Sequence, residues 1–351
     1  MRSLFFEDVN RLGWRDIPAP KVEANHEVLV STIAASCCYV DTMIISGNSP
    51  FEPPFALGHE SVARVIDKGD AVEGLEIGDI VSVPYHRTCG VCPSCVAKNP
   101  LNCHEKEVPI FATYGMPDGS DFGGMFSESY RVPYASHALV KIPASVDPLA
   151  AVAAGDTLSD AWNTTVPHIR NKPDARVLIT SNAGFGLYAA QWALAAGAQQ
   201  VTYVDDDPLR LSVAKDIGAE TLTWSDDLEV PPVYDVIINE RQGEKSLRFC
   251  LLAGAYGAVV ENVVIYLEDV SIPIEAMHYT GVTLRSSFSP TRNFLPEVIA
   301  DLEAGMINPR AIESEVIHLE DAPERLVLPS HKPLIIFDKT VLKEASRDLA
   351  G

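Results

Sequence analysis

The chain has no apolar run long enough to cross a bilayer, and it has few basic residues for its length. Its aliphatic runs, such as VLIT and VIIN, are of strand length, well short of the roughly 18 residues that a membrane helix needs. Lys and Arg number 27 against 48 Asp and Glu, so the formal net charge is −21. Such a surface repels nucleic acid and anionic membranes. We therefore expect neither a nucleic-acid partner nor a membrane partner.

The N-terminal segment also lacks the pattern of a signal peptide. MRSLFFEDVNRLGW reaches acidic residues and a glycine before an apolar region could form, which favours a cytoplasmic protein. The cysteines number seven, and an odd count argues against a framework of disulfides. Clustered cysteines in such a chain indicate metal binding instead.

The chain is long enough for two domains of an α/β protein. It has 351 residues, of which 47% are apolar and 21% charged, as expected for a globular protein. Residues 1–155 are rich in strands and turns and predict a β-rich domain. Residues 156–289 alternate strands with helices, which predicts a doubly wound parallel sheet. The alternation fades over residues 290–351, which we expect to return to the first domain.

Four cysteines are concentrated in the segment CGVCPSCVAKNPLNC, with the spacing C-x2-C-x2-C-x7-C. Four thiolates from one loop can close tetrahedrally around Zn²⁺ and leave no position open for catalysis. We predict a structural zinc with these ligands: Cys89, Cys92, Cys95 and Cys103. An iron–sulfur cluster and free thiols are the alternatives. The metal would fix a lobe, about residues 86–106, that has little core of its own.

This spacing, following Gly58-His59-Glu60 and preceding a strand–turn–helix unit, resembles the zinc-containing medium-chain alcohol dehydrogenases. The resemblance extends over nearly the whole chain. It implies a GroES-like, β-rich catalytic domain and a Rossmann dinucleotide-binding domain. It also implies a homodimer or homotetramer, in which the strand near VTLRSSF often pairs across subunits.

The resemblance further implies a catalytic zinc with three ligands: Cys38, His59 and Asp156. The family pattern C-x-[ST]-D places Asp41 three residues after the ligand and so selects Cys38 over Cys37. One thiolate, one imidazole and one carboxylate leave a net charge near zero, which keeps the zinc a good Lewis acid. Asp41 would orient His59 through its second ring nitrogen, and Glu60 would lie beside the metal. Taken singly, a lone cysteine or histidine is more often an ordinary core residue.

The hydroxyl and imidazole of the family's usual proton relay are missing. Their positions hold Val40 and Met43, which exchange no protons. The favoured function is a zinc- and NAD-dependent oxidoreductase that transfers hydride between nicotinamide and a small alcohol, aldehyde or ketone held by the catalytic zinc. An NADH-dependent reductase of a conjugated C=C bond or imine, and a non-catalytic NAD-binding protein, are the alternatives. Asp160 is a candidate proton acceptor near the nicotinamide, or an acid favoured at a helix N-terminus.

The segment RVLITSNAGFGLYAA has the strand–turn–helix order that binds a pyrophosphate. Its G-x-G-x-x-G fingerprint is degraded, because the first two glycine positions hold Ser181 and Ala183. Asp205 follows about 20 residues later and predicts NAD rather than NADP, since a carboxylate there accepts ribose hydroxyls and repels a 2′-phosphate. The predicted cofactor-binding residues are Ser181, Ala183, Gly184, Phe185, Gly186, Asp205 and Arg210. We interpret Asp206 and Asp207 as surface acids.

Overall fold

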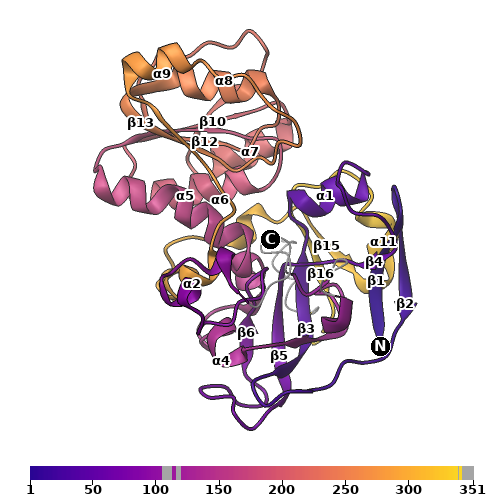
Figure 1. Cartoon of the computed structure of the whole chain (residues 1–351). Helices are drawn as coiled ribbons and strands as arrows, with labels where there is room; N and C mark the ends of the chain where they lie inside the picture. Colours follow the sequence, from indigo (N-terminus) through magenta and orange to yellow (C-terminus); the bar gives the residue numbers. More distant parts are fainter. Residues whose placement is uncertain (105–112, 116–119, 339, 342–351) are drawn as a thin grey trace. The chain divides into compact units, whose positions relative to one another are not determined.

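A computed structural model of the chain describes residues 1–104, 113–115, 120–338 and 340–341 (Figure 1). The chain divides into two compact units. The first consists of Met1–Ser159, Pro290–Gly305 and Glu313–Gly351, and the second of Asp160–Ser289 and Met306–Ile312. The sequence prediction placed all of residues 290–351 in the first domain, and the structure groups Met306–Ile312 with the second unit. Within the described residues, no helix is both long and apolar enough to cross a membrane.

The first unit is built on a seven-stranded sheet in the order β15-β16-β3-β5-β6-β8, with β7 paired to β3. These strands are β3 (Val28–Ser36), β5 (Ser61–Lys68), β6 (Ile80–Ser82), β7 (Ser129–Val132), β8 (Val140–Lys141), β15 (Glu315–His318) and β16 (Pro333–Ile336). β3, β5 and β6 lie side by side in Figure 1. Alternate residues of β3 face the core, where Val28 and Val30 pack with Val65 and Val81.

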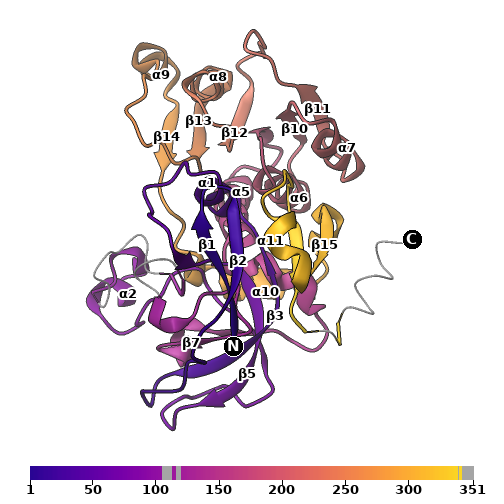
Figure 2. The same ribbon diagram turned by 90° about the vertical axis from the view of Figure 1, so that its right-hand side faces the viewer.

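A smaller sheet of the same unit has the order β2-β1-β4. Its strands are β1 (Arg2–Asp8), β2 (Arg11–Asp16) and β4 (Phe55–Ala56), and β1 and β2 lie side by side in both views (Figures 1 and 2). Its core also receives Ile44 and Ile45 from α1 (Tyr39–Ile45), together with Cys37. This packing fixes the start of α1, where the metal ligands predicted from the sequence begin.

The second unit contains a six-stranded sheet in the order β11-β10-β9-β12-β13-β14, in which every pairing is parallel. Its strands are β9 (Arg176–Thr180), β10 (Gln200–Asp205), β11 (Glu220–Thr223), β12 (Tyr234–Asn239), β13 (Gly254–Asn262) and β14 (Thr283–Ser286). The apolar runs of β9 and β12 are buried, as expected for a sheet covered on both faces. This confirms the predicted combination of a β-rich domain and a doubly wound parallel domain.

Helices cover both faces of this parallel sheet. They are α5 (Thr157–Asn171), α6 (Phe185–Ala195), α7 (Pro208–Asp216), α8 (Glu244–Ala253) and α9 (Ile274–Thr280). Figure 1 shows α8 and α9 on one face of the sheet, and α5 and α6 on the other. The strand order reverses between β9 and β12, the point at which doubly wound sheets bind their ligands.

Short helical segments complete the description. They are α2 (Pro93–Val96), α4 (Ala135–Ala138), α10 (Leu295–Glu303), α11 (Ala322–Arg325), η1 (Pro100–Asn102), η2 (Ser120–Phe122), η3 (Pro148–Gly155), η4 (Thr291–Asn293), η5 (Pro309–Ile312) and η6 (Leu319–Asp321). α2 lies inside the cysteine-rich lobe, and η3 leads directly into Asp156.

Candidate metal centres and dinucleotide site

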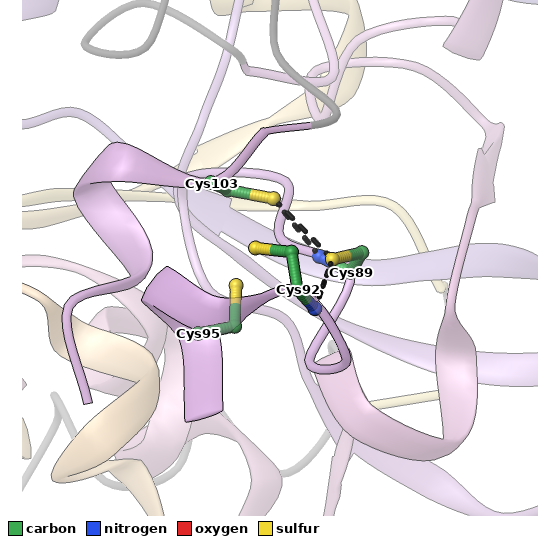
Figure 3. Close-up of side chains that lie close together, drawn as sticks. All are labelled: Cys89, Cys92, Cys95 and Cys103. Carbon is green, nitrogen blue, oxygen red and sulfur yellow. Dashed lines mark hydrogen bonds between the residues drawn. The ribbon is translucent and has the colours of Figure 1, made fainter. Parts of the chain in front are cut away.

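The four lobe cysteines gather around a common centre (Figure 3). Their sulfur atoms all lie within 4.8 Å of one another, and Cys89 Sγ is 3.6 Å from Cys103 Sγ. All four are free thiols. Four sulfurs at about 2.3 Å from one zinc would be roughly 3.8 Å apart, so this cage has the size of a tetrahedral zinc site.

Backbone N–H groups of the lobe point at these sulfurs. Cys92 N–H donates to Cys89 Sγ, and Cys89 N–H donates to Cys103 Sγ, each at 3.4 Å. Hydrogen bonds from the backbone of His104 and Cys95 lower the pKa of Cys92 to about 6. Such donors stabilise thiolates, the form in which cysteine binds a metal.

Three further donor groups of the first unit meet at a second centre. Cys38 Sγ lies 2.8 Å from His59 Nε2, and the same nitrogen lies 3.3 Å from an oxygen of Asp156. The ligand atoms of these three residues lie within 4.8 Å of one another. Cys37 instead packs into the core, so the two adjacent cysteines have separate environments.

The local backbone explains why these side chains converge. Cys38 is the N-cap of α1: its sulfur accepts from Val40 N–H at 3.2 Å, and its own N–H donates to Asp41 Oδ2 at 3.0 Å. Gly58 precedes His59 with φ +102°, and a Cβ there would lie 2.4 Å from the Phe126 ring. The approach that delivers His59 therefore requires glycine.

Acidic groups surround the imidazole of His59. Its Nδ1 lies 3.3 Å from Oδ1 of Asp41, which is completely buried. Burial disfavours the imidazolium, but Asp41, Cys38 and Asp156 together outweigh that effect and raise the pKa of His59 well above its ordinary value. Burial also raises the pKa of the Cys38 thiol to about 12. In the absence of metal, protons on the imidazole and the thiol offset the negative charge of this site. A divalent cation would fit here, because it would displace those protons and supply the positive charge instead.

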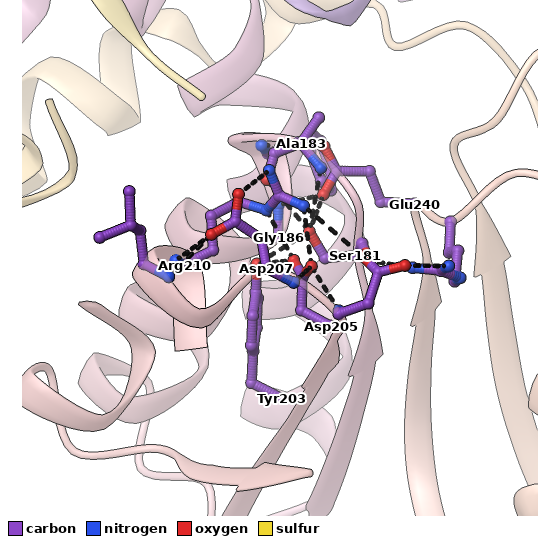
Figure 4. Close-up of polar contacts among 12 residues, drawn as sticks. Ser181, Ala183, Gly186, Tyr203, Asp205, Asp207, Arg210 and Glu240 are labelled. Carbon is purple, nitrogen blue, oxygen red and sulfur yellow. Dashed lines mark hydrogen bonds and ion pairs between the residues drawn. The ribbon is translucent and has the colours of Figure 1, made fainter. Parts of the chain in front are cut away.

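The predicted dinucleotide turn lies between β9 and α6 in the second unit (Figure 4). Gly184 is the N-cap of α6, and Phe185 and Gly186 are its first residues. A Cβ on Gly186 would lie 2.8 Å from the Ser181 side chain, so a small residue is needed there. Ala183 N–H is 3.4 Å from Ser181 Oγ, within the same turn.

The carboxylate at the end of β10 is fully engaged. Asp205 accepts from the N–H groups of Asp206 and Asp207, at 2.7 and 2.9 Å, and from the Tyr203 hydroxyl at 2.9 Å. Arg210 adds a bidentate pair with both contacts at 2.8 Å. Asp205 and Arg210, both predicted to bind the cofactor ribose, are thus ion-paired with each other.

Comparison with known proteins shows which proteins this chain is similar to. Residues 24–144 match the alcohol dehydrogenase GroES-like domain. A probable zinc-binding alcohol dehydrogenase of Mycobacterium tuberculosis is 26% identical, with 92% of this chain and 83% of that protein covered. The structure of an alcohol dehydrogenase from Thermus sp. ATN1 superposes with a TM-score of 0.84 at 27% identity, covering 96% of this chain and 99% of that one. Over nearly its whole length, the chain is similar in sequence and in fold to the zinc-containing medium-chain alcohol dehydrogenases.

These matches confirm the resemblance seen in the sequence and indicate an oxidoreductase of the zinc-type alcohol dehydrogenases. Other relatives carry different names: L-threonine 3-dehydrogenase of Bacillus velezensis is 28% identical, with 88% of this chain and 89% of that enzyme covered. The family therefore includes members with several substrates.

Apolar side chains occupy the positions at which related dehydrogenases have a proton relay. Met43 and Phe55 are buried, and Val40 and Phe51 are partly buried against the core of the small sheet. Asp160 lies in the first turn of α5, just after the division between the two units. Its role near a nicotinamide stays a prediction.

Two functional-site residues were missed from the sequence. Lys332 is buried beside the second candidate metal centre. It is ion-paired with Glu60 and donates to Cys37 O at 3.1 Å and Thr157 Oγ1 at 3.2 Å. Burial disfavours its charge, but Glu60 outweighs burial and raises the pKa of Lys332. The ion pair, with Thr157 N–H 3.2 Å from Glu60 Oε1, holds the Glu60 carboxylate in place.

The second missed residue is Glu240, which directly follows β12. Its carboxylate accepts from Phe185 N–H at 2.9 Å and from Gly186 N–H at 2.8 Å (Figure 4). A single acidic residue beside Arg241 in a predicted loop does not by itself indicate a functional site. Its position one residue beyond a central parallel strand, as for Ser181 after β9, was the available clue.

Proposed function

We propose that this chain is a zinc- and NAD(H)-dependent alcohol dehydrogenase or carbonyl reductase. The observation that carries the proposal is the convergence of Cys38, His59 and Asp156 within 4.8 Å of one another. These residues would hold the catalytic zinc, and the four lobe cysteines would hold a structural one. When bound, zinc would supply Lewis acidity toward a substrate oxygen, and nicotinamide would supply or accept a hydride.

The chain's own residues would prepare this chemistry. Asp41 Oδ1 lies 3.3 Å from His59 Nδ1 and would orient the ring so that Nε2 faces Cys38 and Asp156. Lys332 is ion-paired with Glu60 and favours the carboxylate form, although burial raises the pKa of Glu60 overall. Because Val40 has no hydroxyl, we propose that the substrate proton exchanges through water and Glu60.

The cofactor assignment follows from the second unit. The backbone N–H groups at the start of α6 would receive the diphosphate, and the Asp205 carboxylate would exclude a 2′-phosphate. NAD(H) is therefore the proposed cofactor. The substrate is proposed to be a small or medium alcohol, aldehyde or ketone, and the protein a homodimer or homotetramer whose edge strand β14 pairs with a second copy.

Metal-resolved kinetics test this function. Purified protein should contain two zinc ions per chain and interconvert NAD⁺ and NADH with members of an alcohol and carbonyl panel. Asp156→Asn should lose the second zinc and the turnover together, while the exposed-site control Glu268→Gln keeps both. Turnover confined to enals or iminium compounds would support the conjugated-bond reductase instead. NADH binding without turnover on any substrate would contradict an enzymatic role.

A further inference from the structure

A carboxylate of the protein itself occupies the N-terminus of α6. Glu240 accepts from Phe185 N–H, from Gly186 N–H and from the Ser181 hydroxyl, at 2.9, 2.8 and 2.5 Å (Figure 4). These N–H groups belong to the first turn of an eleven-residue helix and have no partner within the helix. They are the donors that a Rossmann turn offers to a phosphate.

The sheet topology places Glu240 at the ligand-binding point. Glu240 directly follows β12 and Ser181 directly follows β9, and Asn239 pairs with Thr180 in the parallel ladder between those strands. The strand order reverses between these two strands, and doubly wound sheets bind dinucleotides in the crevice outside that reversal. The carboxylate therefore lies at the carboxyl ends of the two strands between which the order reverses.

The surroundings of Glu240 make it a displaceable anion. Within the described part of the chain, the hydrogen bonds to its carboxylate come from neutral groups, and Arg241 next to it pairs with Asp206 at 2.6 Å. Burial and the nearby Asp205 raise the pKa of Glu240 above its ordinary value in spite of these hydrogen bonds. A buried carboxylate without a paired cation costs free energy. Movement of the Glu240 side chain toward solvent, or its protonation, would remove that cost.

A hydrogen-bonded network joins the Glu240 carboxylate to Asp205 and Arg210, the residues predicted to lie near the cofactor ribose. The Tyr203 hydroxyl lies 2.9 Å from both Ser181 Oγ and Asp205 Oδ2, and Asp205 pairs with Arg210. The groups predicted to bind the diphosphate and those predicted to bind the ribose are thus hydrogen-bonded within the protein. A change in the contacts of Glu240 would alter the hydrogen bonds of Tyr203 and Asp205.

We propose that Glu240 competes with the cofactor diphosphate for the N–H groups of Phe185 and Gly186, so that Glu240 sets the affinity for the dinucleotide. Two anions cannot accept from the same two donors, and a carboxylate left nearby repels the incoming phosphates. Binding therefore requires that the Glu240 side chain withdraw or take up a proton. This inference rests on the proposed function in that a dinucleotide is the ligand.

Calorimetric titration with NADH and with ADP-ribose tests the inference without any turnover. Glu240→Gln keeps the size of the side chain and removes its charge, and Glu240→Ala empties the position if the glutamine variant folds poorly. Glu268→Gln is the matched control, because it removes the same charge from an exposed position of the second unit. We expect the Glu240 variants to bind both ligands at least tenfold more tightly than the parent, and the control to be unchanged.

Equal or weaker affinity in both Glu240 variants would overturn the inference, as would the absence of binding in every variant. The proposed function fails by different results. Tight binding in Glu240→Gln without turnover on any substrate would contradict the enzymatic role and leave the competition intact. Turnover in the parent with unchanged affinity in the variants would overturn the competition and leave the enzymatic role intact.

Discussion

The side chains of Ser181 and Glu240 meet at 2.5 Å although 59 residues separate them. Each residue follows the end of a central parallel strand, and those strands are neighbours in the sheet. The contact places an internal anion at the turn that is proposed to bind the cofactor diphosphate. Dinucleotide binding to this chain is therefore expected to respond to the charge of one residue that the family fingerprint does not contain.

The pH dependence of dinucleotide affinity follows from that contact. The pKa of Glu240 is raised in the free protein, and a bound diphosphate would favour its neutral form further. Binding is then coupled to proton uptake, so affinity should rise as pH falls, by up to about tenfold per pH unit above the pKa of free Glu240.

The control for this effect is Glu240→Gln, whose NADH affinity should vary little between about pH 8 and pH 6. The other titratable groups facing Glu240 are Tyr203 and Asp205 from β10, with Arg210 beyond them. The pKa of Tyr203 lies well above its ordinary value, so this phenol does not titrate in that range. If the NADH affinity of the parent and of Glu240→Gln changed equally with pH, a group other than Glu240 would be responsible for the pH dependence.

Cofactor choice should depend on Asp205. Asp205→Asn removes the charge that repels a 2′-phosphate and releases the Arg210 guanidinium from its bidentate pair. We expect the preference for NADH over NADPH to fall at least tenfold, measured as the ratio of dissociation constants. Asp206→Asn removes the same charge from the adjacent, half-exposed position and should leave the ratio unchanged.

Substitution of the two adjacent cysteines should affect different properties of the protein. Cys38→Ser is expected to reduce the zinc content from two ions per chain to one, because the ligand Sγ near His59 Nε2 is lost. Cys37→Ser should keep both ions but lower the free energy of unfolding by about 1–3 kcal/mol, since it buries a hydroxyl in an apolar cluster. Elemental analysis and urea unfolding measure the two effects. Equal zinc content in both variants would contradict the assignment of the ligand.

The buried pair of Lys332 and Glu60 should be needed for stability. Lys332→Met leaves the Glu60 carboxylate buried without its cation and should destabilise the protein by about 3–5 kcal/mol. The double variant Lys332→Met with Glu60→Gln should recover much of that loss. If the single and double variants unfold at the same urea concentration, the carboxylate is not what the lysine stabilises.

Local patterns were enough to predict much of this molecule. The alternation of strands and helices after Arg176 identified the parallel sheet, and the cysteine spacing identified the lobe. The family pattern anchored on Asp41 selected Cys38 over Cys37, and in the structure Cys38 and Asp41 form the capping box of α1. Each of these signals lies within a short stretch of chain.

The missed residues depend on contacts between distant segments. Lys332 lies 272 residues from Glu60, and Glu240 lies 54 residues from Gly186. Their partners are set by strand order, which hydrophobic periodicity does not encode. Arg210 is likewise predicted near a ribose from its position after Asp205, but its ion pair with Asp205 is seen only in the structure.

Anomalous scattering at the zinc absorption edge tests the central claim most directly. In crystals of fully metallated protein, we predict two peaks per chain: one among the four lobe sulfurs and one bounded by Cys38 Sγ, His59 Nε2 and an Asp156 oxygen. A single peak, confined to the lobe, would contradict hydride transfer at a zinc site in this chain.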